Sequence, residues 1–337
     1  MTPPRSQQDQ RWDAEAGAAL ATVLIMLVVM AVLAVAVLEA ARFSVARFDN
    51  QRRMEQARWY LLGAERFAAA QAFRASDSVE SAALGGQWEG QSVTFPIDGG
   101  ALTISVWDGS NCFNLNSLIV ASDEGYTVAS PIGQIEFVRL LELTPAQVFS
   151  GQGLAAALSD YLDTDSIPAP GGAEDSFGGL GDEYQTANTL MGDVSELQRV
   201  QGFSAEVVAA LSPHVCTRPQ SAPSVLNVNT LRREDAALLA AAFGEGLSVT
   251  AAEMVIASRP AGGWADVEAF LSNPLLRSIE VGDSLNGRFA VRPHFLVVNA
   301  RVSWDGLEEA SAALIEVGPS SRVVRRVFGP QTTERSV

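Results

Sequence analysis

The sequence predicts an α+β protein in which a long N-terminal helix precedes an antiparallel sheet, and an all-helical region interrupts that sheet. Three observations support this prediction. An unbroken apolar run near the N-terminus passes directly into a charged, helix-favouring stretch. Segments that alternate apolar and polar residues occur near both ends of the remaining chain, and helical periodicity fills the interval between them. A chain of 337 residues is long enough for a stalk and one or two domains with cores of their own.

The apolar run extends from Ala16 to Leu38, and Thr22 is its one polar residue. A helix of this length measures about 35 Å, which exceeds the roughly 30 Å thickness of a bilayer's hydrocarbon core, so a membrane span is predicted. No Pro or Gly occurs between Ala18 and Leu62. The same helix is therefore predicted to continue to Phe73, embedded in the membrane in its first half and amphipathic in its second.

Strands are predicted on both sides of the helical region. Residues Gln91–Pro96 and Ala101–Trp107 alternate apolar and polar side chains around the turn sequence IDGG, as a hairpin does. Segments 289–304, 310–318 and 321–329 are rich in β-branched residues and are separated by turn sequences. We expect all of them to form one discontinuous sheet packed on the long helix.

Helical segments occupy the chain from about Ile132 to Leu285. Capping residues indicate where they begin, with Thr250 and Glu253 as a predicted capping box and Asp266 as a predicted N-cap. Short connections that contain Gly favour helical hairpins. Two stretches, 196–215 and 225–243, resemble helix-hairpin-helix or SAM-like units.

The N-terminal third resembles the type IV pilin and pseudopilin family, whose prepilin peptidase cuts after a Gly that precedes the apolar helix. The resemblance implies a cut between Gly17 and Ala18, with Met1–Gly17 as a hydrophilic leader and N-methylation of Ala18. Most family members carry Glu as the fifth mature residue, whereas this chain has Thr22. That departure is typical of the K minor pseudopilins of type II secretion.

The sequence WDGSNCFNLNSL at 107–118 is similar to the entry of the K pseudopilins' helical insertion, which follows an Asn-Leu-Asn motif. Hydrogen bonds from Asn and Asp side chains to the backbone would also make a turn here in any loop. The two interpretations are compatible. The resemblance implies a leader at 1–17, a transmembrane and stalk helix at 18–75, a discontinuous pilin-like α/β domain at 76–112 and 286–329, an inserted helical domain at 113–285, and a tail at 330–337.

The same resemblance implies a function and partners. A K pseudopilin is expected at the tip of the type II secretion pseudopilus, where it is needed for pseudopilus initiation and for protein export across the outer membrane. The implied partners are the minor pseudopilins I and J, the major pseudopilin, the prepilin peptidase and the inner membrane. The alternative is a membrane-anchored periplasmic minor pilin or a competence-type protein with helix-hairpin-helix units.

Charge bears on topology and on nucleic-acid binding. Arginines flank the apolar run on both sides, so their distribution does not decide the orientation. The resemblance implies a single pass with the head in the periplasm.

The chain has a net charge of −16 and contains no Lys, and nine acidic residues but no Arg lie between Gly151 and Gln198. Such a surface repels phosphate, so no nucleic acid is expected as a partner, although Asn227–Thr230 resembles DNA-binding competence proteins.

Acidic residues gather in the Gly-containing stretch from Asp160 to Asp175. Calcium binds six to eight oxygens from carboxylates and carbonyls on flexible loops, but the spacing is not that of an EF-hand, and a solvated acidic loop is the alternative. K pseudopilins bind calcium in their helical domain, and this region resembles theirs. The resemblance implies calcium with the ligands Asp160, Asp163, Asp165, Glu174 and Asp175.

The two cysteines, Cys112 and Cys216, lie far apart in the sequence and form no CxxC pair, unlike zinc or thioredoxin-like motifs. In an oxidising compartment we expect one disulfide that ties two parts of the head together. Two unrelated buried thiols are the alternative, because the sequence does not show whether the Cα atoms lie within bridging distance.

Enzymatic motifs are lacking in the sequence. The two histidines, His214 and His294, each adjoin a Pro, and a structural role is the expected one. No nucleophile elbow, HExxH motif or P-loop occurs. We therefore expect a protein that is not an enzyme.

Overall fold

The computed structural model describes residues 7–77, 89–123, 125–145, 150–165, 167–172, 186–279, 285–318 and 321–329. The chain divides into two compact units, Met1–Trp59 and Tyr60–Val337. The predicted tail at 330–337 and the predicted ligands Glu174 and Asp175 lie outside the described residues.

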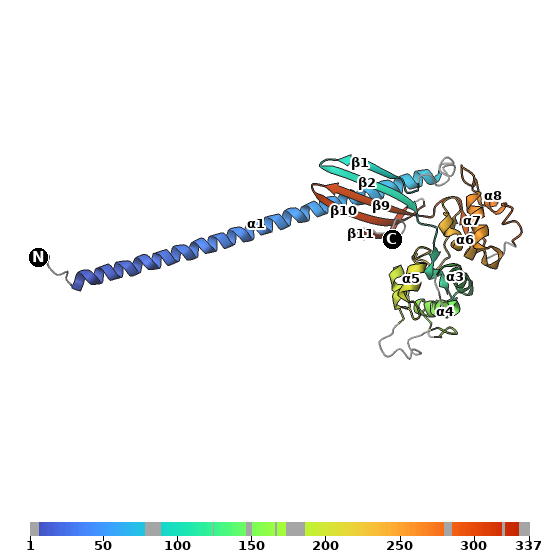
Figure 1. Ribbon diagram of the computed structural model, residues 1–337, viewed down its shortest axis with the longest axis horizontal. Helices are drawn as coiled ribbons and strands as arrows, with labels where there is room; N and C mark the ends of the chain where they lie inside the picture. Colours follow the sequence, from blue (N-terminus) through green and yellow to red (C-terminus); the bar gives the residue numbers. More distant parts are fainter. Residues whose placement is uncertain are drawn as a thin grey trace. The chain divides into compact units, whose positions relative to one another are not determined.

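Helix α1 (Gln7–Asp77) is continuous and begins before the predicted cleavage junction (Figure 1). No Pro or Gly occurs between Gln7 and Ala16, so nothing in the chain stops the helix there. In the first unit, the apolar side chains from Leu20 to Leu38 are all exposed. Among the described residues, one helical segment, Gly17–Gln71, is long and apolar enough to cross a membrane. An exposed apolar surface of this size is typical of a membrane-embedded segment.

The second unit contains a five-stranded antiparallel sheet, as predicted. Its strands come from both ends of the unit, with β2 and β9 paired in register from Gly100↔Trp304 to Asp108↔Leu296. The hairpin turn at Asp305-Gly306 has positive φ at both residues, 48° and 79°, as a type I′ turn requires. The strand order is β1-β2-β9-β10-β11, with bounds β1 (Ser92–Ile97), β2 (Gly100–Asp108), β9 (Phe295–Trp304), β10 (Leu307–Glu316) and β11 (Arg322–Phe328).

The C-terminal part of α1 packs against this sheet. Leu61, Ala64 and Ala68 recur at helical spacing and are buried, and the small size of the two alanines lets the helix approach the strands closely. The ring of Phe67 meets that of Phe95 edge to face, with centroids 5.6 Å apart. Glu65, also buried, accepts hydrogen bonds from Arg326 of β11.

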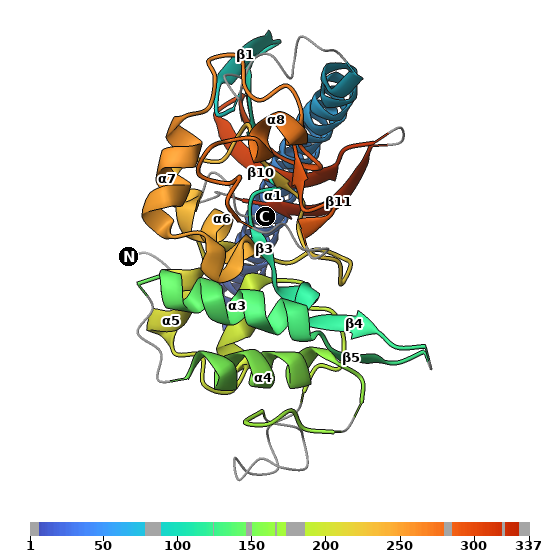
Figure 2. The same ribbon diagram turned by 90° about the vertical axis from the view of Figure 1, so that its right-hand side faces the viewer.

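Between β2 and β9 the chain forms two consecutive groups of short elements (Figure 2). The buried apolar side chains of both groups form one core. The first group comprises β3 (Phe113–Asn114), the 3-10 helix η1 (Leu115–Leu118), β4 (Ile119–Ala121), β5 (Thr127–Ala129), α3 (Pro131–Leu143), α4 (Gly151–Leu162), the 3-10 helix η2 (Val194–Arg199), α5 (Ala205–Leu211) and β6 (Val215–Cys216).

The second group comprises β7 (Leu226–Asn227), the 3-10 helix η3 (Arg233–Asp235), α6 (Ala236–Ala242), the 3-10 helix η4 (Gly244–Gly246), α7 (Val249–Ala257), α8 (Val267–Leu271) and β8 (Phe289–Ala290).

Two local predictions are wrong. The N-cap of α7 is Ser248, whose side chain accepts from the backbone of Ala251, so Thr250 and Glu253 form no capping box. The predicted strand 289–304 is divided, because β8 pairs with β7 in the helical region and only β9 joins the main sheet. The predicted N-cap Asp266 is confirmed.

Candidate functional sites

The predicted cleavage junction lies in α1. Gly17 and Ala18 are exposed, and a Cβ added at Gly17 would meet nothing within 4 Å. The hydroxyl of Thr22 donates to the Ala19 carbonyl at 2.8 Å, so the one polar side chain of the apolar run is satisfied within its own helix.

Two of the predicted calcium ligands are buried at the end of α4. Asp160 is 0% exposed and Asp163, the C-cap of the helix, is 2% exposed. Asp160 Oδ1 accepts from the Ala169 backbone at 3.0 Å, and Asp165 accepts from the Ile167 backbone at 2.7 Å. Among the described residues, no three or more Asp, Glu, His or Cys side chains lie close enough to hold a metal ion.

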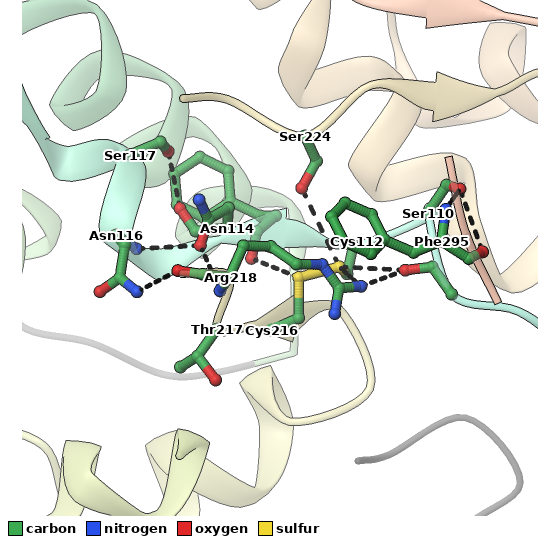
Figure 3. The surroundings of a disulfide bond; sticks show 12 residues. Ser110, Cys112, Asn114, Asn116, Ser117, Cys216, Thr217, Arg218, Ser224 and Phe295 are labelled. Carbon is green, nitrogen blue, oxygen red and sulfur yellow. Dashed lines mark hydrogen bonds between the residues drawn. A yellow bond between two sulfur atoms is a disulfide. The ribbon is translucent and has the colours of Figure 1, made fainter. Parts of the chain in front are cut away.

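The two cysteines form a disulfide with a Cα–Cα distance of 5.7 Å. Strand β3 runs parallel to β6, with Phe113 opposite Val215 and Asn114 opposite Cys216, and this pairing brings the cysteines together (Figure 3). The bond closes the first group of elements, since one cysteine precedes β3 and the other lies in β6.

The Asn-Leu-Asn motif holds this first group together. Asn114 caps η1, and its side-chain oxygen Oδ1 also accepts from the Arg218 backbone N–H at 3.0 Å. Asn116 makes a two-way contact with the backbone of Met191, accepting at 2.8 Å and donating at 3.0 Å. Both asparagines are buried, so each amide replaces water contacts with backbone partners.

A second asparagine pair repeats this arrangement. Asn227 accepts from the backbone of Asn229 at 3.1 Å. Asn229 accepts from the backbone of Trp264 at 2.7 Å and donates to its carbonyl at 3.0 Å. Strand β7 pairs parallel with β8, as β3 pairs with β6. The two groups of elements therefore begin and close in the same way.

A buried polar network joins the sheet to the helical region. Asp108, the last residue of β2, accepts from Asn227 Nδ2 at 2.6 Å, from Thr230 Oγ1 at 2.7 Å and from the Ser110 backbone at 2.7 Å. Asn111 accepts from the Asn227 backbone at 2.8 Å. Because these groups are buried and bonded to one another, they fix the helical region on the sheet rather than leave it on a flexible linker.

Arg218 also lies at this junction between the sheet and the helical region. Its buried guanidinium donates to the Gly109 carbonyl and lies 4.5 Å from the ring centroid of Phe295. Burial lowers the pKa of Arg218 to about 10, although the nearby Asp108 carboxylate opposes the shift. The side chain therefore stays charged at neutral pH.

The two groups of elements are also linked by a buried ion pair. Arg288 donates to Glu136 of α3 through two hydrogen bonds of 2.7 and 2.6 Å. Their side chains are 9% and 8% exposed. This bidentate geometry satisfies both charges, and it ties α3 to the chain immediately before β8.

His214 is half-buried. Burial lowers its pKa, although Asp235 and Glu234 oppose the shift, so the imidazole is neutral at neutral pH. The backbone of His294 donates to Ser110 Oγ at 2.9 Å and belongs to the junction.

A surface ion pair links β11 to η2. Arg325 donates to Asp193 and, at 2.9 Å, to the Gly192 carbonyl. Burial of the Asp193 carboxylate raises its pKa, but hydrogen bonds from Ser195 and Arg325 outweigh burial, and the pKa falls to about 2.

We predict that the free energy of unfolding decreases as the pH falls from about 4 to about 2, because protonation of Asp193 then removes this contribution. The loss is about 1 kcal/mol or less, since Asp193 is 43% exposed and solvent screens the pair. Thermal unfolding at pH 5 and pH 2.5 measures it. Asp193→Asn keeps the cap and should reduce the difference between the two pH values; an unchanged difference would contradict the assignment.

Comparisons with known proteins agree with this architecture. Two family models, each described as type II secretion system (T2SS), protein K, match residues 111–220 and 226–292. Type II secretion system protein K of Pectobacterium carotovorum subsp. carotovorum is 31% identical over 95% of this chain and 98% of its own length. The corresponding protein of Klebsiella pneumoniae is 33% identical over 94% of this chain and 97% of its own length.

A solved structure is also similar. The chain resembles one in the crystal structure of the GspK-GspI-GspJ complex from the enterotoxigenic Escherichia coli type 2 secretion system, with a TM-score of 0.69 and 25% identity. The match covers 85% of this chain and 100% of that one.

A long apolar N-terminal helix that packs on an antiparallel sheet, with a helical region between the strands, defines a minor pseudopilin. The boundary between the two family models falls between β6 and β7, where the second group of elements begins. The chain belongs to the type II secretion system protein K family. This family is a structural component of the secretion machinery.

Proposed function

We propose that this chain occupies the tip of the type II secretion pseudopilus, where it initiates assembly and supports protein export across the outer membrane. Its proposed partners are the minor pseudopilins I and J, with the major pseudopilin below them. The observation that carries the proposal is the similarity, over 85% of this chain, to a chain of the GspK-GspI-GspJ complex. The role is one of assembly, and no chemical reaction is proposed for it.

The helical region supports a terminal position. In the sequence it lies between β2 and β9, two interior strands of the sheet, and the buried hydrogen bonds of Asp108 hold it to the end of β2. A large body held rigidly there would obstruct a subunit stacked above, whereas the end of a fibre has no such subunit. Deleting the gene from its host should stop secretion of type II substrates, and the intact chain should restore it. Normal secretion after deletion would contradict the proposal.

The finer fold assignment follows from the repeated asparagine pairs. We infer two SAM-like or helix-hairpin-helix units within an inserted domain at 113–285. Each starts with Asn-x-Asn followed by Ser or Thr and Leu, and each closes with a short parallel strand, of which β8 lies just beyond residue 285. The pilin-like domain would then comprise 76–112 and 286–329, after a transmembrane and stalk helix at 18–75. The strong negative charge of the inserted domain supports a packing role for these units rather than DNA binding.

The membrane anchor is proposed to lie in the bacterial inner membrane, in a single pass with the head in the periplasm. The exposed apolar helix and the exposed junction Gly17-Ala18 support a prepilin peptidase substrate. We predict a mature protein that begins at Ala18 and carries an N-methyl group. Intact-mass measurement of the membrane-extracted protein tests this prediction, and residues 1–17 still attached would contradict it.

Calcium is the proposed ligand of the acidic region. Asp160 and Asp163 bury two carboxylates one helical turn apart, and such a pair is costly unless a cation or hydrogen bonds compensate. A calcium ion bound by both would supply that compensation, with Asp165, Glu174 and Asp175 as further proposed ligands. The ion would neutralise the two buried carboxylates at the end of α4 and hold the proposed ligands around it.

We therefore predict that saturating calcium raises the melting temperature, by an amount that grows with its concentration over the dissociation constant. Asp163→Asn should abolish the increase while the metal-free variant still folds, because the substitution also removes repulsion. Asp123→Asn, which makes the same charge change at an exposed position, is the control and should keep the full increase. Equal stabilisation of all three proteins by calcium would show that the ligands lie elsewhere.

A further inference from the structure

The two sulfur atoms of the disulfide have different surroundings (Figure 3). Arg218 Nη2 lies 3.2 Å from Cys112 Sγ, and Ser224 Oγ lies 4.0 Å from it. The Gly109 carbonyl is 3.9 Å from the same sulfur, but it already accepts from the Arg218 guanidinium. Cys216 Sγ instead lies 3.6 Å from the carbonyl oxygen of Phe113. A guanidinium stabilises negative charge on the first sulfur, whereas a carbonyl oxygen disfavours it on the second.

The two cysteines also differ in how accessible they are to an external thiolate. Cys112 is 8% exposed and is enclosed by the junction between the sheet and the helical region. Cys216 is only partly buried. An external thiolate therefore reaches Cys216 more readily than Cys112.

In thiol–disulfide exchange, the attacking thiolate bonds to one sulfur and the other sulfur leaves with the electron pair of the broken bond. The sulfur with the lower thiol pKa leaves faster. Accessibility and charge thus select the same direction here, with attack on Cys216 and departure of Cys112.

We propose that Cys216 is the site of mixed-disulfide formation with external thiols, and that Arg218 is a positioning residue that stabilises Cys112 as the leaving thiolate. The incoming thiolate forms a new S–S bond to Cys216 Sγ. The electron pair of the original bond remains on Cys112 Sγ beside the guanidinium, and no proton transfer is required. A second thiol completes the reduction by attack on the mixed disulfide.

Peptide mapping of the wild-type protein tests the direction without any variant. The full-length protein in detergent is incubated with reduced glutathione, quenched with acid and alkylated with N-ethylmaleimide. The expected product carries glutathione on Cys216 and the alkyl group on Cys112. Glutathione on Cys112, on both cysteines equally or on neither would overturn the proposal.

The reduction rate tests the role of Arg218. An opposite charge in contact lowers a pKa by roughly 1 to 3 units. If exchange responds to the leaving-group pKa by about half a logarithmic unit per pKa unit, Arg218→Gln should slow reduction roughly 3- to 30-fold. Arg218→Lys should retain part of the effect. Arg259→Gln is the control, because Arg259 is partly buried and, like Arg218, donates to a backbone carbonyl, that of Leu231, at 2.9 Å.

The control variant should be reduced at the wild-type rate. Equal rates for wild type and Arg218→Gln would contradict the assigned role, as would an equal slowing of the Arg259→Gln control. If Arg218→Gln does not fold, the comparison of Arg218→Lys with wild type and the wild-type peptide map decide the question.

Discussion

Replacing Glu136 with Ala is expected to destabilise the helical region by about 3 to 5 kcal/mol, because it leaves the guanidinium of Arg288 buried without its counter-charge. In the intact protein, this pair makes two short hydrogen bonds and both side chains are almost fully buried. Arg288 Nε also donates to the Ser224 carbonyl at 3.3 Å, so the charge is held in place and cannot turn outward to water without breaking that contact.

Urea unfolding of the full-length protein in detergent, followed by near-ultraviolet circular dichroism, measures the change. Glu142→Ala on the same helix is the control, because Glu142 pairs with Arg139 at the surface, and it should cost less than about 1 kcal/mol. The double change Glu136→Leu with Arg288→Met removes both charges and should recover most of the loss. A double variant that is no more stable than Glu136→Ala would contradict this explanation.

This pair also shows what the sequence does not reveal. Glu136 and Arg288 are far apart in the chain, and each belongs to a residue type that is usually exposed. Only the fold brings them together. The same holds for Asp108 and Arg218, whose burial at the junction depends on contacts with Asn227 and Phe295. The Asn and Asp residues of 107–118 were the local signal beside Asp108, and they predicted a turn rather than a buried network.

Long elements with a regular pattern of apolar residues could be predicted from the sequence. The apolar stretch of α1 and the alternation of β2 and β9 follow from patterns within the segments themselves. The ladders β3–β6 and β7–β8 contain two residues in each strand, too few for any periodicity. Their partners are also distant in sequence. The capping box at Thr250 failed for a different reason, since Ser248 is an equally good cap two residues earlier.

The candidate calcium region was predictable as a group of carboxylates but not as a geometry. The sequence placed Asp160, Asp163 and Asp165 together, and the structure buries the first two while the third accepts from its own loop. Helical spacing puts Asp160 and Asp163 on one face of α4. Nothing in the spacing indicates which carboxylates the fold takes out of water.

The second large effect is expected at Leu27, near the middle of the apolar run. Leu27→Arg should prevent recovery of the chain in an assembled tip complex, because a guanidinium at the centre of a membrane helix costs about 2.5 to 3.5 kcal/mol and finds no partner among apolar neighbours. Leu27→Met keeps the apolar surface and should assemble normally. The measurement is co-isolation of the complex from membranes.

Thr22→Glu is the contrasting change. The Thr22 hydroxyl donates only to its own helix, at Ala19, so its replacement breaks no contact to another element of the described structure. The added carboxylate can protonate or meet an N-terminal amine, and assembly should be largely retained. Loss of the complex with Thr22→Glu but retention with Leu27→Arg would overturn the argument.

The place of this chain at the pseudopilus tip is tested most directly by co-isolation with its proposed partners. The tagged, full-length chain is expressed with the minor pseudopilins I and J in cells that lack the major pseudopilin, and membrane complexes are purified through the tag. The account predicts that I and J are both recovered in amounts comparable to the tagged chain. Recovery of neither partner, under conditions in which I and J still co-isolate with each other, would contradict it.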